Sequence, residues 1–155
     1  MRLYLDIDGV LTANPDSIEH IESLEINDAL VEWRQSDVHR LLNAFDEVVW
    51  ATTWIFTPQD LDIIERHLDV KHDRVQLKLE PFVKTKRTGH SCGKLPAVRS
   101  HFNANPAPFM WIDDEMGSAD HDWARSVGGE CIRPLYDEGG VYAMLDQILS
   151  VASKT

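Results

Sequence analysis

Residues 3–10 read LYLDIDGV, a short apolar run that ends in two aspartates followed by a glycine. An Asp-Gly pair is ordinary turn chemistry at the end of a buried strand, but a turn does not need both Asp6 and Asp8. In an extended chain, side chains two residues apart point to the same side. The stretch therefore predicts a strand over residues 2–7 that places two carboxylates at one site, with Gly9 allowing a sharp turn beside it.

The length and charge of the chain limit the kinds of protein it can be. Its 155 residues fit a single domain, 1–155. Lys and Arg number 15 against 26 Asp and Glu, which gives a formal net charge of −11. This charge disfavours a broad nucleic-acid or anionic-membrane surface, since both require positive potential. An acidic chain that handles phosphate needs a cation to mask its carboxylates.

The cysteines and the apolar segments favour a cytoplasmic location. Cys92 and Cys131 lie far apart in sequence, without metal-ligand spacing, and are interpreted as free thiols in a reducing compartment. The N-terminal apolar run is too short for a secretory signal. No apolar stretch approaches the roughly 18 residues needed to span a membrane. We therefore expect a cytoplasmic protein with no membrane partner, and a monomer by default.

Strand-like and helix-like segments alternate along the chain. After 2–7, the predicted strands are 47–52, 74–79, 109–112 and 130–135, and the predicted helices are 36–45, 57–68, 94–102, 119–127 and 139–152. Residues 12–20 are polar and loop-like, and Asn27-Asp28 indicates a small hairpin within 23–33. The alternation predicts an α/β fold with a mainly parallel sheet flanked by helices.

Polar side chains follow three of the predicted strands. They are Asp6 and Asp8, Thr52 and Thr53, and Asp113 and Asp114. Ligands bind at the carboxyl ends of strands in such sheets, so we expect these groups to meet at one edge if the strands are neighbours. Carboxylates this close repel each other, and a hard cation such as Mg²⁺ relieves the repulsion because it takes oxygen ligands. A threonine hydroxyl there can donate to a phosphate oxygen.

Basic and aromatic residues supply further candidates. Lys94 opens a predicted helix after a glycine-containing loop, and it is either a surface lysine or the partner of an anionic site. Lys84 and Lys86 belong to a local basic cluster with Arg87, which is either a solvated loop or a contact for substrate phosphate. Trp54, beside the second strand end, is either a core residue or a pocket wall on which a base can stack.

The order of these residues resembles the haloacid dehalogenase (HAD) superfamily. Its four motifs correspond to DIDGV (6–10), VVWAT (48–52), Lys94 and WIDDE (111–115), an ordered set that spans most of the chain. The whole pattern is similar to the small HAD domains linked to RNA repair. The resemblance implies a Rossmann-like core with a small flap at about 12–35. The stretches after the first two strands are too short for a large cap.

The resemblance also implies catalytic roles. Asp6 attacks phosphorus and forms an aspartyl-phosphate, while Asp8 protonates the leaving oxygen and then activates water. Thr52 binds the transferring phosphoryl group, and Lys94 steadies that group and the nucleophile. Gly9 lies beside them. The predicted activity is therefore that of a phosphoric monoester hydrolase.

The implied cofactor is Mg²⁺. It is held by the Asp6 carboxylate, the main-chain carbonyl of Asp8 and a fourth-motif acid, for which Asp114 is the better candidate with Asp113 beside it. The predicted partner is a phosphorylated substrate. A site without a large cap stays open, which favours a large substrate, such as a polynucleotide end or a protein, over a small metabolite sealed under a lid. The substrate we expect is a nucleotide or a polynucleotide end.

Some assignments stay open at the level of sequence. Thr53 is an alternative to Thr52 for binding phosphate, because the exact end of the second strand is unknown. Lys84 or Lys86 is an alternative to Lys94 as the lysine of the third motif. Together with Gly9 and Trp54, residues 53, 84 and 86 are the candidate substrate contacts.

Two other functions compete with the phosphatase reading. A receiver-type signalling domain also gathers acids, a threonine and a lysine at a sheet edge, but it places its acidic pair after the first strand and its phospho-acceptor aspartate after the third. Here the Asp-x-Asp comes first and the adjacent pair at 113–114 comes late. A catalytically silent HAD-fold module that only binds phosphate would have lost a motif residue, and Asp6, Asp8, Lys94 and Asp114 are all present.

Overall fold

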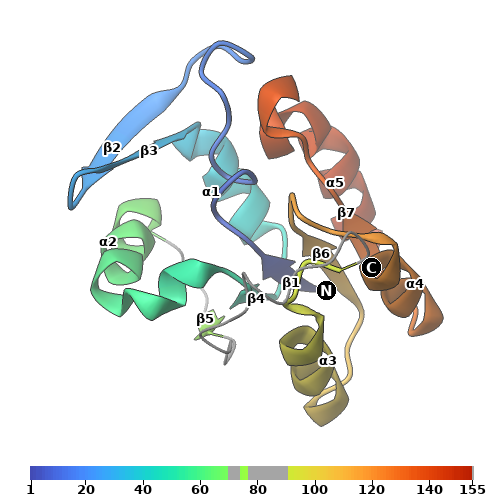
Figure 1. The fold of residues 1–155 in the computed structure, drawn as a ribbon. Helices are drawn as coiled ribbons and strands as arrows, with labels where there is room; N and C mark the ends of the chain where they lie inside the picture. Colours follow the sequence, from blue (N-terminus) through green and yellow to red (C-terminus); the bar gives the residue numbers. More distant parts are fainter. Residues whose placement is uncertain (70–73, 77–90, 155) are drawn as a thin grey trace.

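The computed structural model describes residues 1–69, 74–76 and 91–154, and a five-stranded sheet forms its centre (Figure 1). Every neighbouring pair of strands in this sheet is parallel. The strands are β1 (Arg2–Leu5), β4 (Glu47–Trp50), β5 (Arg74–Gln76), β6 (Phe109–Ile112) and β7 (Glu130–Ile132). The predicted α/β fold with a mainly parallel sheet is confirmed, although the strands are shorter than the apolar runs that indicate them.

The order of the strands across the sheet is β5-β4-β1-β6-β7. In chain order this is the 3-2-1-4-5 arrangement of the Rossmann type, whereas receiver domains have the order 2-1-3-4-5. The chain adds strands to one side of β1 and then returns to add β6 and β7 on the other side. The direction therefore reverses between β1 and β6, and a crevice for ligands opens at the carboxyl ends of those two strands.

Helices cover both faces of the sheet (Figure 1). They are α1 (Gln35–Asn43), α2 (Pro58–Leu68), α3 (Leu95–Ala104), α4 (Ser118–Ser126) and α5 (Leu145–Ala152). Leu3 and Leu5 of β1 pack in the core formed with α1, α2 and α5, whereas Tyr4 packs in the core formed with α3 and α4. Because both faces are buried, the strands are apolar throughout instead of alternating.

The helix α1 begins one residue before the predicted helix 36–45. Ser36 and Asp37 are residue types that often cap helices, but Arg34 occupies the N-cap position and makes no side-chain cap bond. Asp37 lies in the first turn and forms ion pairs with Arg34 and Arg40. The carboxylate prefers these two guanidinium groups to the helix N–H groups, so the helix begins earlier than predicted.

Three 3₁₀ helices were not expected from the sequence. They are η1 (Thr53–Phe56), η2 (Tyr136–Glu138) and η3 (Gly140–Met144). The prediction of one continuous helix over 139–152 is wrong, because Gly139 and Gly140 have φ values of 91° and 57° and the α-helical part begins at Leu145. Positive φ values are incompatible with a regular right-handed helix, so the chain enters α5 through a tighter turn.

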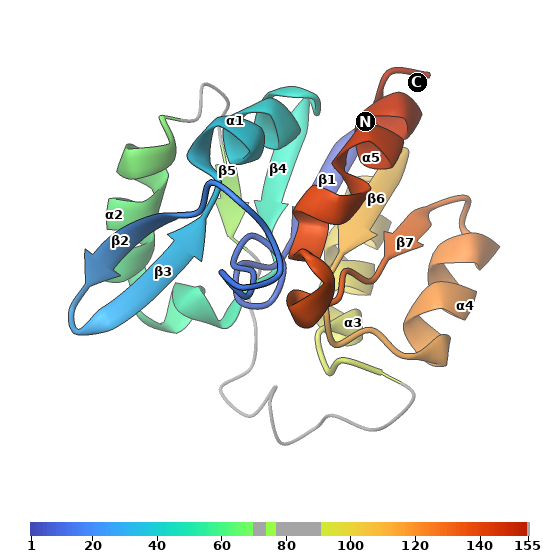
Figure 2. The ribbon, with the colours of Figure 1, turned by 90° about the horizontal axis from the view of Figure 1, so that it is seen from above.

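The insertion between β1 and α1 contains a two-stranded hairpin, formed by β2 (Glu22–Ile26) and β3 (Ala29–Trp33). Asn27 and Asp28 connect the strands with φ values of 45° and 66°, which is the geometry of a tight primed turn and confirms the predicted hairpin. Figure 2 shows the hairpin beside α2, and the Asn27 side chain donates a hydrogen bond to Asp60 of that helix. No larger cap lies among the described residues.

No helix within residues 1–69, 74–76 and 91–154 is both long enough and apolar enough to cross a lipid bilayer.

Tyr142 of η3 makes a buried polar contact with the insertion. Its hydroxyl donates to the carbonyl of Leu11 and accepts from the backbone N–H of Arg34 at 2.9 Å. One side chain thus joins the loop after β1 to the start of α1.

We expect Tyr142→Phe to lower the free energy of unfolding by about 1–3 kcal/mol, because it leaves buried backbone groups without their partner. Urea titration followed by fluorescence measures this change. Tyr136→Phe is the matched control, since Tyr136 is 41% exposed and should change the stability little. Equal effects of the two substitutions would contradict the proposed link through Tyr142.

Candidate active site at the carboxyl ends of β1 and β6

The register of the sheet brings Asp6 and Asp113 to the same level. Leu5 of β1 pairs with Ile112 of β6, so each aspartate is the first residue after its strand. The backbone N–H of Asp6 donates to the carbonyl of Ile112 at 3.1 Å and extends the pairing by one step. Both side chains are buried, with exposures of 6% for Asp6 and 0% for Asp113.

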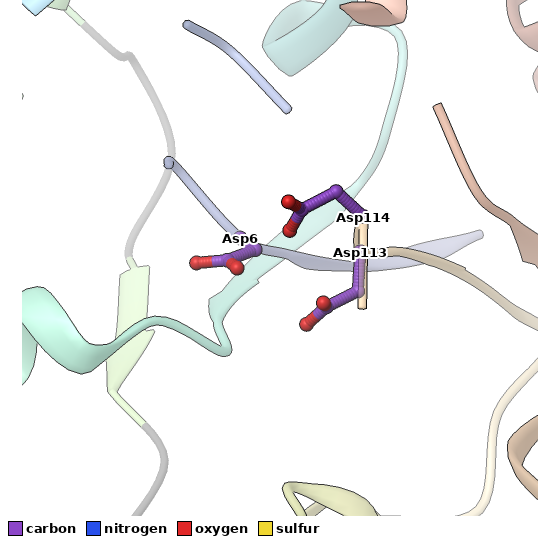
Figure 3. A group of neighbouring side chains, drawn as sticks. All are labelled: Asp6, Asp113 and Asp114. Carbon is purple, nitrogen blue, oxygen red and sulfur yellow. The ribbon is translucent and has the colours of Figure 1, made fainter. Parts of the chain in front are cut away.

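Asp114 completes a cluster of three carboxylates (Figure 3). One oxygen from each of Asp6, Asp113 and Asp114 lies within 4.8 Å of the other two. The acids come from two strands that are far apart in sequence but adjacent in the sheet. The structure therefore brings the first and fourth motifs to one place, at the point where the strand order reverses.

Lys94 is the counter-charge of this cluster. Its ammonium lies 2.7 Å from Oδ2 of Asp6 and 2.6 Å from Oδ2 of Asp113, and its side chain is only 3% exposed. Burial opposes a positive charge, but the charges of Asp6 and Asp113 outweigh it and raise the pKa of Lys94 above its usual value. Lys94 caps α3, so the start of that helix fixes the position of the ammonium between β1 and β6.

The negative charge of the three carboxylates is larger than the positive charge of Lys94. Burial raises the pKa of Asp113, although the charge of Lys94 opposes this shift. Burial, together with the charges of Asp6 and Glu115, raises the pKa of Asp114 from its usual 3.8 to about 6. Ionised Asp114 is thus unfavourable in the protein alone, and a bound cation would remove that cost.

Gly9 allows the first motif to approach Asp114. Its φ is 72°, and a Cβ atom added there would lie 2.2 Å from Oδ2 of Asp114. Glycine is therefore required both by the backbone conformation and by the lack of space. The carbonyl of Ile7 accepts bonds from the backbone N–H groups of Val10, Leu11 and Thr12, which winds the loop tightly beside the acids.

Asp8 is not one of the three grouped carboxylates. It is exposed, and its Oδ2 accepts a hydrogen bond from the indole N–H of Trp54 at 3.0 Å. The strand predicted over residues 2–7 ends at Leu5, so Asp8 lies in the turn that follows and not in an extended segment. The two aspartates instead have different surroundings, one buried against an ammonium and one exposed against an indole.

Thr52 and Thr53 differ in exposure. Thr52 is fully buried and its Oγ1 accepts the backbone N–H of Trp54 at 3.4 Å, as the cap of η1. Thr53 is the first residue of η1 and is half-buried. Among the described residues, no acceptor for the Thr52 hydroxyl proton is found, which leaves it able to donate to a ligand. The candidates Lys84 and Lys86 lie outside the described residues.

Arg133 is a cation at this edge that the sequence did not reveal. Its Nε donates to the backbone carbonyl of Asp114 at 2.8 Å, and the side chain is exposed. The predicted strand 130–135 places this residue within a strand, but β7 ends at Ile132. An earlier strand end would have identified Arg133 as a polar group at the ligand-binding edge.

The cluster fits a hard divalent cation. Carboxylate oxygens are the ligands that Mg²⁺ takes in proteins, usually one or two together with water and substrate oxygens. Asp6 and Asp114 supply such oxygens, Lys94 offsets only part of the charge, and Gly9 keeps the space beside Asp114 free of a side chain. A cation is thus favoured by the chemistry of the donors and by the raised pKa of Asp114.

A Rossmann-ordered parallel sheet with an aspartate after β1, a buried lysine and an acidic pair after β6 defines a protein of the HAD type. Comparison with known families matches residues 2–134 to the HAD domain in Swiss Army Knife RNA repair proteins, and the chain belongs to this family. The resemblance inferred from the sequence is thereby confirmed. No curated protein and no solved structure matches the chain.

We expect Gly9→Ala to weaken divalent-cation binding by displacing Asp114. Gly128→Ala is a matched control, because Gly128 also has a positive φ of 77° but nothing lies within 4 Å of an added Cβ. Both variants carry the backbone strain, and only Gly9→Ala crowds the cluster. Titration of Mn²⁺ followed by electron paramagnetic resonance measures the affinity. Equal loss in both variants would contradict a specific role for the space beside Asp114.

Asp114→Asn should stabilise the metal-free protein at pH 7.5. The folded-state pKa of Asp114 lies above its usual value, so its ionisation favours unfolding, and this penalty grows as the pH rises from about 4 through about 6. In EDTA, Asp114→Asn should unfold at a higher Tm than wild type at pH 7.5, and the difference in Tm should be smaller at pH 5. Mg²⁺ at about 100 times its Kd should raise the free energy of unfolding of wild type by about 2.7 kcal/mol, and that of the variant by much less. A pH-independent gain would contradict this linkage.

Proposed function

We propose that the chain is a magnesium-dependent phosphomonoester hydrolase that works through an aspartyl-phosphate on Asp6. The observation that carries the proposal is the buried Asp6 carboxylate, which contacts the Lys94 ammonium at 2.7 Å beside Asp114. Family membership supports it, since the matched family is a HAD domain. In this arrangement a phosphate meets a carboxylate nucleophile, a fixed positive charge and a cation site.

Asp6 suits the part of a nucleophile. Its Oδ1 accepts a hydrogen bond from the backbone N–H of Ile7 at 2.8 Å and its Oδ2 accepts one from the Lys94 ammonium, and these two contacts orient the carboxylate. Each carboxylate oxygen keeps a further lone pair. One of the two oxygens attacks phosphorus, and the bond from phosphorus to the leaving oxygen breaks as the aspartyl-phosphate forms.

Asp8 suits the part of general acid and base. It shares neither the burial of Asp6 nor its contact with Lys94, and two carboxylates in different surroundings can take different roles. Asp8 gives a proton to the leaving oxygen in the first step. In the second step it takes a proton from the water that attacks phosphorus, and Asp6 is released as a carboxylate.

The remaining residues bind the phosphate and the cation. Thr52 donates its hydroxyl to a phosphoryl oxygen, with Thr53 as the neighbour that can assist. Asp6, the main-chain carbonyl of Asp8 and Asp114 would hold Mg²⁺, with Asp113 beside them. Bound Mg²⁺ would supply positive charge that offsets the phosphoryl oxygens.

The substrate we propose is the phosphorylated end of a polynucleotide. The hairpin of the insertion is too small to seal the site, and the matched family is named for RNA repair proteins. The net charge of −11 works against a long nucleic-acid footprint. We therefore expect the protein to contact the terminal nucleotides and little beyond them.

The decisive assay is phosphate release with Mg²⁺ from mononucleotides, from oligonucleotides phosphorylated at the 5′ or 3′ end, and from sugar phosphates. Asp6→Asn should lower turnover by about 1,000-fold or more, as loss of a nucleophile does in other covalent enzymes. Asp122→Asn is the control, because Asp122 is an exposed acid on α4 whose side chain is 75% exposed. Turnover that survives in Asp6→Asn would overturn the mechanism, and a preference for sugar phosphates would overturn the substrate.

A further inference from the structure

Trp54 connects the loops that follow two neighbouring strands. Its backbone N–H donates to Oγ1 of Thr52, two residues after the end of β4, and its indole N–H donates to Oδ2 of Asp8, in the turn that follows β1. The residues joined by the indole bond are 46 positions apart in sequence. The bond exists because β1 and β4 are adjacent and parallel, so their carboxyl ends meet.

The backbone of Asp8 is fixed, whereas its side chain needs a contact to fix it. The tight turn around the carbonyl of Ile7 sets the main chain. The Asp8 side chain is exposed, so core packing does not select its rotamer. The indole N–H of Trp54 is a directional donor that favours one orientation of the carboxylate.

We propose that Trp54 is a positioning residue that holds Asp8 in the orientation for proton exchange with the leaving oxygen and with water. This inference rests on the proposed function, and it assigns Trp54 a role through its N–H group that differs from stacking of a base on its ring. Oδ2 of Asp8 accepts from the indole in both protonation states. Oδ1 then carries the proton that is transferred.

The bond also links the phosphate-binding motif to the acid. Thr52 caps η1 and so fixes the backbone of Trp54, and Trp54 in turn orients Asp8. A phosphoryl group bound to the Thr52 hydroxyl is therefore connected to the proton donor Asp8 through Thr52 and Trp54. The same short helix sets the position of the phosphate and the position of the proton.

The role predicts different effects in the two chemical steps. When phosphorus bonds to Asp6, the electron pair of the broken bond goes to the leaving oxygen. An alkoxide needs the proton of Asp8, whereas p-nitrophenolate leaves without one. When water then attacks phosphorus, its proton goes to Asp8 and the pair of the broken bond returns to Asp6. This second step needs Asp8 whatever the first leaving group was.

The test compares Trp54→Phe with wild type on an alkyl phosphate and on p-nitrophenyl phosphate. Phenylalanine keeps a ring and removes the N–H. We expect kcat/KM of Trp54→Phe to fall by about 10–100-fold for the alkyl phosphate, which is part of the rate enhancement that general acid catalysis usually provides. For the aryl phosphate we expect a fall of less than about 3-fold. Rapid mixing with the aryl phosphate should show a burst of about one p-nitrophenolate per protein, because the intermediate accumulates.

Controls separate the N–H bond from the fold of η1. Asp8→Asn should show the same split between substrates in a stronger form. Phe56→Leu alters a 43% exposed ring on the same short helix without removing an N–H group, and it should leave both rates unchanged. If Trp54→Phe unfolds, β-(3-benzothienyl)alanine at position 54 keeps the shape of the indole with sulfur in place of N–H, and should reproduce the split.

Three outcomes overturn the inference. One is an equal loss on both substrates without a burst, which indicates a structural role for Trp54. Another is unchanged rates in a folded variant that lacks the N–H. Both leave the proposed function standing as long as wild type is active. Wild type that hydrolyses neither substrate with Mg²⁺ overturns the proposed function, and this inference with it.

Discussion

The contact of the Lys94 ammonium with the carboxylates of Asp6 and Asp113 is the constraint on which the rest of the site depends. It joins the ends of β1 and β6 to the start of α3 in a setting from which water is excluded. A buried charge without a partner is strongly destabilising, so these three groups must be fixed together. Burial and the charges of Asp6 and Glu115 still raise the pKa of Asp114 to about 6 despite the charge of Lys94, and a bound cation would favour its ionised form.

Much of the fold follows from local sequence signals. Apolar runs of strand length, separated by amphipathic segments, predicted the parallel sheet, and Asn27-Asp28 predicted the hairpin. The meeting of Asp6 with Asp113 and Asp114 followed from one further rule, that ligands bind where parallel strands end. Rules of this kind succeed because they depend on backbone geometry, which few side chains disturb.

Other features depend on contacts that no local pattern reports. Asp8 lies in a turn because β1 ends at Leu5, and its indole partner belongs to the short helix that follows β4. Arg133 was missed for the same reason, since β7 ends before the apolar run does. Strand ends are set by the residues across the sheet, so a sequence read one segment at a time cannot locate them.

In the mechanism we propose, the phosphoryl group is transferred to Asp6 before it is transferred to water. The most direct measurement is a rapid acid quench during turnover with Mg²⁺, followed by peptide mapping of the phosphorylated site by mass spectrometry. We expect a hydroxylamine-sensitive phosphoryl group on Asp6, at a level that rises when hydrolysis of the intermediate is slowed by Asp8→Asn. Phosphorylation of a different residue, or turnover with direct inversion at phosphorus and no protein-bound phosphate, would contradict it.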